Sequence, residues 1–150
     1  MVEPRVRRAT EDDAEGISAV IAEILKDPEP VALREPLSPE QVVRWMDRLG
    51  DNGGLFVCEV EGDVVGFSAL DYNTEEPDTA TLGVWLLAPH RKKGYGTLLA
   101  ERALEHAREK GYKRIRGRLP QNNEVALSFL SSIGALVPLY NPEARFELPL

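Results

Sequence analysis

The chain has 150 residues, of which 43% are hydrophobic and 29% are charged. These values are typical of a single globular domain, residues 1–150, and exclude a disordered chain. The formal net charge of −7 disfavours nucleic-acid binding, because phosphate backbones are bound by basic faces.

No stretch approaches the roughly 18 to 20 apolar residues that a membrane span requires, and the first residues lack an apolar signal core. We therefore expect a cytoplasmic protein without a membrane partner. The single cysteine, Cys58, lies in an apolar run and is expected to pack in the core. Together with His90 and His106 it shows no metal-ligand spacing, so no metal site is expected.

The first half of the chain predicts two helices and a strand pair. Thr10 is a helix-capping residue, and apolar residues then recur at helical spacing at Ile17, Val20, Ile21, Ile24 and Leu25. Ser38 and Pro39 predict the start of a second helix that ends near residue 49. Residues 55–60 and 64–72 are predicted strands, joined by a hairpin turn at residues 61–63.

The second half predicts a buried strand over residues 81–87, a glycine turn and a helix over residues 97–110 that Gly111 ends. His106 is expected on the solvated side of this helix. A basic strand over residues 112–119, a helix over 124–133 and strands over 136–139 and 144–148 follow. The predicted element order is β-α-α-β-β-β-α-β-α-β-β, a mixed α+β sheet with helices on both faces.

The turn contains the sequence Arg91-Lys-Lys-Gly-Tyr-Gly96 between the strand and the helix. Glycine lets a ligand approach the backbone, and the first turn of a helix offers amides without intrahelical partners, so this loop suits a phosphate. A dinucleotide site would need a third glycine where Leu99 stands, and the Gly-Lys-Ser/Thr of a P-loop is absent. A plain glycine-rich turn remains the alternative.

This R-x-x-G-x-G loop after a strand resembles the acyl-CoA pyrophosphate loop of the GNAT N-acyltransferase superfamily. A second motif of that family, N-x-x-A-x-x-F followed by a glycine, is matched by Asn123, Ala126, Phe129 and Gly134. Two motifs in the right order are more specific than either alone. By motif the resemblance runs from about residue 79 to residue 135.

The resemblance implies a central mixed, mostly antiparallel sheet and acetyl-CoA as cosubstrate, with no metal. It implies cofactor contacts from Val84, Trp85, Leu86, Arg91, Lys92, Lys93, Gly94, Tyr95, Gly96, Thr97 and Asn123. The backbone around Trp85 and Leu86 would pair with the pantetheine arm like an added strand, at a splay in the sheet. The acceptor would be a small-molecule amine, a protein N-terminus or a lysine, and a homodimer is possible.

The chain also departs from the family pattern. Leu130 replaces the tyrosine that often protonates the leaving thiolate, and the strand lacks its frequent acidic residue. Tyr140 and Glu76 are the catalytic candidates that remain. The sequence thus indicates an N-acetyltransferase, with an acyl-CoA-binding module without turnover as the alternative. Acidic groups around the first two helices would favour a cationic acceptor such as a polyamine.

Overall fold

The computed structural model describes residues 3–26, 35–72, 74–91, 93–118 and 145–149. Within them a six-stranded sheet has the order β1-β2-β3-β4-β5-β6, antiparallel at every pair except the parallel pair β4 and β5. The strands are β1 (Arg5–Arg8), β2 (Gly54–Val60), β3 (Asp63–Tyr72), β4 (Thr79–Leu86), β5 (Arg114–Arg118) and β6 (Arg145–Pro149). The mixed, mostly antiparallel sheet expected from the sequence is confirmed.

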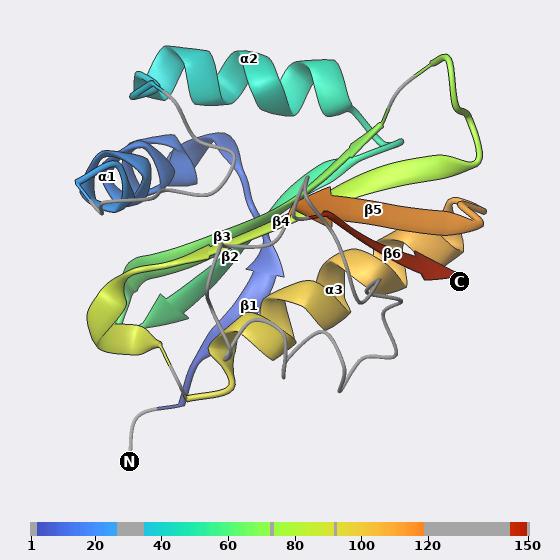
Figure 1. Cartoon of the computed structure of the whole chain (residues 1–150). Coiled ribbons are helices and arrows are strands. Elements are labelled where there is room, and N and C mark those ends of the chain that lie inside the picture. The colour runs from blue at the N-terminus through green and yellow to red at the C-terminus, as the bar shows by residue number, and fades with distance from the viewer. Residues whose placement is uncertain (1–2, 27–34, 73, 92, 119–144, 150) are drawn as a thin grey trace.

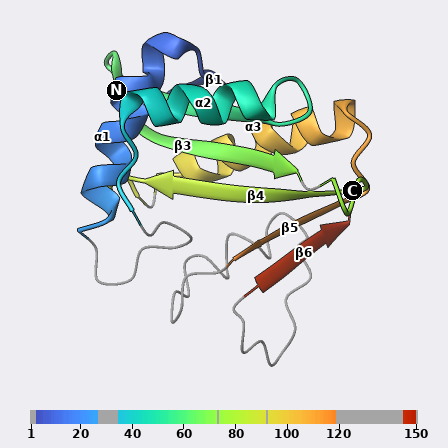
Figure 2. The ribbon, with the colours of Figure 1, turned by 90° about the horizontal axis from the view of Figure 1, so that it is seen from above.

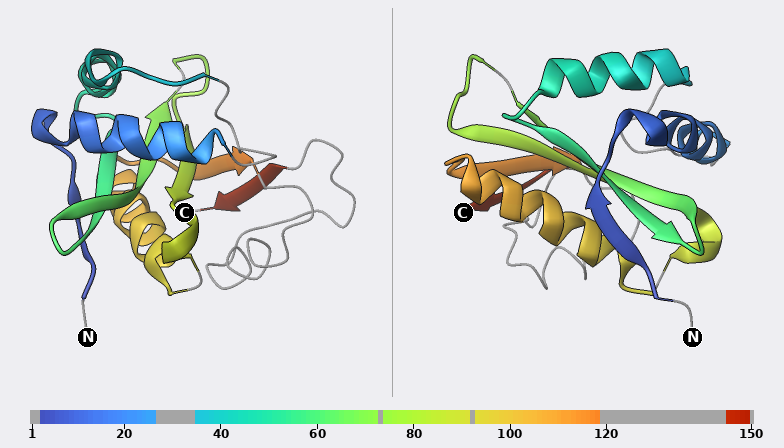
Figure 3. Two further views of the ribbon diagram at one scale, coloured as in Figure 1. Left: turned by 90° about the vertical axis from the view of Figure 1, so that its left-hand side faces the viewer. Right: turned by 180° about the vertical axis from the view of Figure 1, so that it is seen from behind.

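Helices cover both faces of the sheet, as expected (Figure 1). α1 (Ala14–Ile24) and α2 (Pro39–Leu49) lie on one face and α3 (Tyr95–Glu109) lies on the other, which Figure 3 shows from two sides. Successive side chains of each strand point to opposite faces of the sheet, so each strand contributes to both cores. Leu82 and Ile115 pack with α3, whereas Phe67 and Trp85 pack with α1 and α2.

Local sequence signals explain the first two helices. Ile17 and Ile21 are fully buried on the inner side of α1, as their spacing predicts. At the start of α2, the Gln41 amide donates to Ser38 Oγ at 3.2 Å, and the Ser38 amide donates to Gln41 Oε1 at 2.8 Å. This reciprocal capping box and Pro39 set the first turn, and α2 has the predicted limits.

The hairpin between β2 and β3 is also as predicted. Val60 pairs with Asp63, which leaves Glu61 and Gly62 as a two-residue turn. Both have positive φ, 53° and 85° respectively. That combination is the type I′ turn, whose twist matches the twist of the flanking strands.

α3 begins at Tyr95, two residues before its predicted start at residue 97. Gly94 adopts the left-handed conformation, with φ of 84°, so the chain can enter the helix directly after it. At the other end Gly111, with φ of 82°, terminates the helix as predicted.

One expectation about α3 is wrong: His106 is buried, with 5% of its surface exposed. Its Nε2 lies 2.9 Å from the Asp51 carbonyl oxygen, and its ring meets Phe56 edge-on. The loop before β2 folds over this side of α3, a tertiary contact that helical periodicity does not contain. Cys58, in contrast, is buried as expected, and burial raises the pKa of its thiol.

An ion-pair cluster fixes β1 against the start of α1. Arg7 Nη1 and Nη2 donate to the two oxygens of Asp13 at 2.7 and 2.8 Å, and Arg7 Nε donates to Glu59 on β2. The hydrogen bonds from Arg7 hold the pKa of Asp13 below its ordinary value of 3.8, although burial opposes them. The cluster therefore joins β1 and the start of α1 to β2, which lies 52 residues further along the chain at Glu59.

The last third of the chain is described only in part. The helix and strand predicted over residues 124–133 and 136–139 lie outside the described residues. β6 agrees with the predicted strand over 144–148 within one residue at each end. Among the described helices, none is long and apolar enough to cross a membrane.

Candidate functional site

β4 and β5 separate from each other within the sheet. They pair only over three positions, Thr79–Thr81 of β4 with Arg114–Arg116 of β5. β4 continues to Leu86 and stays paired with β3 from Ala80 to that end. Figure 2 shows the two strands together at one end and diverging toward the end of β4. The edge of β4 that faces β5 is therefore open beyond Thr81, within the part of the chain that the structure describes.

The ladder with β3 decides which backbone groups face this open edge. The Leu87 amide donates to the Val65 carbonyl at 3.0 Å, so Leu87 points its backbone toward β3. In an antiparallel ladder this orientation alternates along the strand. Trp85 therefore directs its backbone toward β3, whereas Val84 and Leu86 direct theirs toward the opening. Leu82 shares their orientation, which sequence reasoning had not identified.

The side chain of Trp85 lies on the face of the sheet that α1 and α2 cover. Its indole stacks on Phe67 with ring centres 4.8 Å apart, and Phe67 in turn meets the ring of Trp45 on α2 edge-on at 6.2 Å. The indole lies across Gly83, where an added Cβ would come within 2.1 Å of the ring. Gly83 is thus required by packing, and the three rings connect β4 to α2.

The glycine loop brings the start of α3 beside this opening. A Cβ added to Gly96 would lie 3.5 Å from Leu86 Cδ1 and 3.8 Å from Val84 Cγ1. The Leu98 amide donates to the Gly94 carbonyl at 3.2 Å. The amides of residues 95–97 precede that bond and have no intrahelical acceptor by helix geometry. Since Gly94 has no side chain, it cannot cap them.

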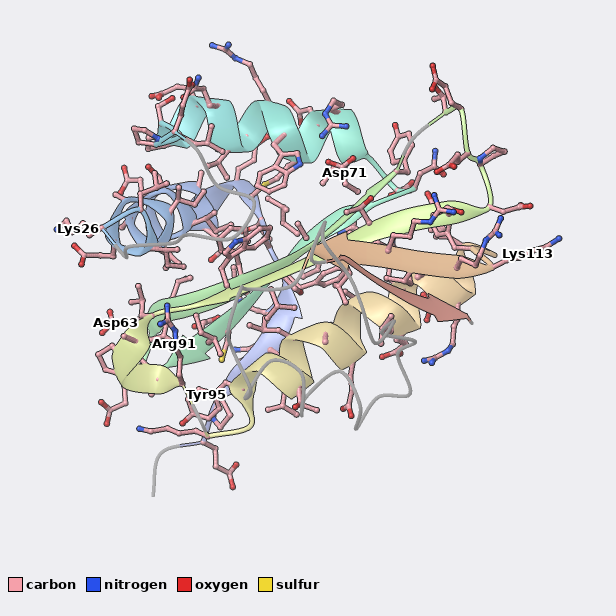
Figure 4. The ribbon with its side chains drawn as sticks, viewed as in Figure 1. Lys26, Asp63, Asp71, Arg91, Tyr95 and Lys113 are labelled. Atoms are coloured by element: carbon pink, nitrogen blue, oxygen red, sulfur yellow. The ribbon has the colours of Figure 1, made fainter. Side chains whose placement is uncertain are left out.

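The side chains of the loop have different environments. Arg91 Nε donates to the Leu86 carbonyl at 3.0 Å, which ties the loop to the end of β4, and Lys93 is exposed. Tyr95 is buried in a cluster with Cys58 and Leu99. Figure 4 shows Arg91 and Tyr95 at the same end of the sheet. Lys92 and Asn123 lie outside the described residues.

His90 completes the loop. Its ring stacks on that of Tyr95, with centroids 6.5 Å apart. Its Nδ1 is buried and has no hydrogen-bond partner among the described residues. The residue as a whole is partly exposed.

The catalytic candidates are only partly placed. Glu76 lies in the loop before β4, and both of its carboxylate oxygens accept hydrogen bonds from Arg116 Nη1, at 3.0 and 2.9 Å. Tyr140 lies outside the described residues, as does Leu130. Among the described residues no group of three or more His, Cys, Asp or Glu side chains could hold a metal ion.

A second carboxylate that the sequence did not single out faces the same side of the sheet. Asp71 on β3 accepts hydrogen bonds from Arg48 Nη1 and Nη2 at 3.0 and 2.7 Å and from the Tyr72 amide at 2.8 Å. Burial alone would raise the pKa of Asp71, but these hydrogen bonds hold it below its ordinary value of 3.8. Figure 4 shows Asp71 between α2 and the sheet. Asp71 is thus an anionic anchor for the end of α2.

Comparison with known proteins gives consistent matches. The model of the acetyltransferase (GNAT) family matches residues 19–135. An uncharacterized N-acetyltransferase of Archaeoglobus fulgidus is 30% identical over 113 residues, which cover 72% of this chain and 76% of that protein. An uncharacterized N-acetyltransferase of Methanocaldococcus jannaschii is 32% identical over 96 residues, 61% of this chain but only 42% of that protein.

A similar fold occurs in yncA of Salmonella typhimurium, whose structure contains acetyl-CoA as its cofactor. The TM-score is 0.84, and the superposition covers 98% of this chain and 94% of that one. At 18% sequence identity this likeness shows the fold alone.

Proposed function

Because this chain belongs to the acetyltransferase (GNAT) family, we propose that it transfers the acetyl group of acetyl-CoA to an amine. The observation that carries the proposal is the open edge of β4 directly beside the start of α3. An open strand edge accepts an extended arm by strand addition, and a helix start accepts phosphates. One long ligand with an amide-containing arm and a pyrophosphate, such as acetyl-CoA, can reach both features.

We assign the contacts as follows. The backbone groups of Leu82 and Val84 and the Leu86 amide would pair with the arm, and the amides of residues 95–97 would hold the pyrophosphate. Lys93 and Arg91 supply positive charge at the loop, and Arg91 also fixes the loop through its bond to Leu86. Lys92 and Asn123 remain assigned to cofactor binding on their sequence motifs.

The reaction needs few protein groups. The amine nitrogen attacks the thioester carbon, the new N–C bond forms as the C–S bond breaks, the amine loses a proton and the CoA thiolate gains one. Holding the two reactants in attack geometry can contribute roughly 7 to 11 kcal/mol, whereas proton transfer contributes about 10²- to 10⁴-fold in rate. A leaving thiol with an ordinary pKa of about 8.5 is tolerable without a protein acid. Positioning is therefore the larger effect.

Thiol release measured on a panel of amines with acetyl-CoA tests the proposal, with acetyl-CoA binding measured separately by calorimetry. We expect binding together with amine-dependent release of CoA. Binding without release on any amine would favour the alternative, an acyl-CoA-binding module, which the loss of the usual tyrosine at Leu130 suggests. Absence of binding would contradict both functions.

We retain Glu76 as the proposed acceptor of the amine proton and Tyr140 as the proposed donor to the thiolate. Tyr140→Phe removes only the hydroxyl group. If Tyr140 protonates the thiolate, turnover falls about 10²-fold with nearly unchanged acetyl-CoA binding. Turnover equal to that of the unchanged protein would assign this proton to solvent.

A further inference from the structure

The point where β4 and β5 separate has one closed face and one accessible face. On the α3 side, Ala80, Leu82 and Ile115 are buried against Ala103 and Leu104 of the helix. On the α1 and α2 side, Thr81 is exposed. If the proposed function holds, the arm of acetyl-CoA runs from the start of α3 toward Thr81. An amine can then approach the thioester only over the face that carries Thr81.

Three strands place polar side chains in one row on that face. Asp71 of β3 pairs in register with Thr81 of β4, and Thr81 pairs with Arg116 of β5. Neighbouring strands lie about 4.8 Å apart, so the row spans about 10 Å. The row is wide enough for the amine and one further group of a small acceptor.

Each acid beside this row already has an arginine partner. Arg48 donates to the two oxygens of Asp71 through Nη1 and Nη2, and the Trp45 indole nitrogen lies 3.4 Å from the same carboxylate. Glu76 binds Arg116, so the four charged groups sum to zero. A polyamine, which the acidic groups around the first two helices had suggested as acceptor, would find no uncompensated carboxylate among these residues.

The two ion pairs differ in how readily they can open. Arg116 Nη1 contacts both carboxylate oxygens of Glu76, and the side chains of this pair are 40% and 51% exposed. Exposed ion pairs contribute little to stability, so Arg116 and Glu76 can exchange partners at little cost. The Asp71 carboxylate is 30% exposed and has two further donors, which makes it a fixed anchor. The exchangeable pair is therefore Arg116 with Glu76.

Resting on the proposed function, we propose that the acceptor is a small zwitterionic amine of the amino-acid type, bound between Arg116 and Glu76. Its carboxylate replaces Glu76 on Arg116, and its ammonium group binds the released Glu76 carboxylate. Every charge keeps an opposite partner, and one weak pair becomes two charge-assisted contacts. The ammonium nitrogen then lies next to the Glu76 carboxylate, which we propose takes its proton, on the face that carries Thr81.

The test compares free amino acids with their uncharged-carboxyl amides and with spermidine, at fixed acetyl-CoA. We expect kcat/KM for at least one free amino acid to exceed that for its amide at least tenfold. Arg116→Gln should remove this preference through KM and leave the Kd for acetyl-CoA unchanged. Arg114→Gln is the matched control, because Arg114 is the exposed neighbour two residues away on the same face. It should change the preference less than twofold.

Binding gives a second readout that does not depend on turnover. In the presence of CoA, the preferred free amino acid should raise the unfolding temperature of the unchanged protein but not of the Arg116→Gln variant. Equal kcat/KM for acid and amide, a preference for spermidine, or equal stabilisation of the two proteins would overturn the inference while acetyl-CoA binding still supports the proposed function. Loss of acetyl-CoA binding in the unchanged protein would instead overturn the proposed function and the inference with it.

Discussion

The starts of α2 and α3 solve the same physical problem in opposite ways. Both helices begin with amides that have no intrahelical acceptor. At α2 the Ser38 and Gln41 side chains satisfy this end within the protein. At α3 the preceding residue is Gly94, which has no side chain to offer. A helix start that the chain caps itself is structural, and one left open beside an open strand edge is available to a ligand.

The largest expected effect comes from placing a negative charge at the open helix start. A side chain at Gly96 would make ordinary contacts with Leu86 and Val84, so Gly96→Asp should fold. Its carboxylate would repel the phosphates of the ligand at the same amides. We expect at least about 100-fold weaker acetyl-CoA binding by calorimetry, equivalent to about 2.7 kcal/mol.

Gly96→Ala is the matched control, because it adds the Cβ without the charge. Its affinity should stay within about fivefold of that of the unchanged protein, a loss of less than about 1 kcal/mol. Equal losses for the two variants would mean that space, and not charge, governs the loop.

A substitution at the capped start of α2 should lower the stability of the protein and leave its affinity for acetyl-CoA unchanged. Ser38→Ala removes the oxygen that accepts from the Gln41 amide. We expect the free energy of unfolding, measured with denaturant, to fall by about 1 kcal/mol. The acetyl-CoA affinity should not change. A comparable loss of affinity would show that α2 also supports the cofactor site.

The smallest effect concerns side-chain charge beside the open start. Lys93 is exposed, so Lys93→Gln should weaken CoA binding only about threefold at low salt, and less at high salt. Lys110→Gln, an exposed lysine at the other end of α3, is the control and should leave binding unchanged. A pantetheine fragment should not distinguish the two variants, since it lacks the pyrophosphate.

The same contrast explains what could be predicted from sequence. The start of α2 follows from Ser38, Pro39 and Gln41, which act within one turn of each other. The start of α3 was placed two residues late because the left-handed conformation of Gly94 is a property of the folded loop. The sequence therefore predicts the start of a helix best where neighbouring side chains cap the free amides of that helix.

Contacts across the sheet could not be read from the chain. Asp71 and Arg48 are 23 residues apart, and Glu76 and Arg116 are 40 apart. Their meeting depends on strand order and register, as does the finding that Leu82 and Val84, and not Trp85, turn their backbones to the opening. The glycine loop has a compact motif, whereas the acceptor side that we propose is assembled from distant residues, so the sequence could single out only the loop.

The central claim is that the start of α3 binds the cofactor and the start of α2 does not. An amide-resolved NMR titration with CoA reports on both helix starts in one experiment. We predict saturable shifts of the amides of residues 95–97 and of Leu82, Val84 and Leu86, with no shift of the amides of residues 40–42. Shifts confined to the α2 start, or unchanged amides at the α3 start under saturating CoA, would contradict the account.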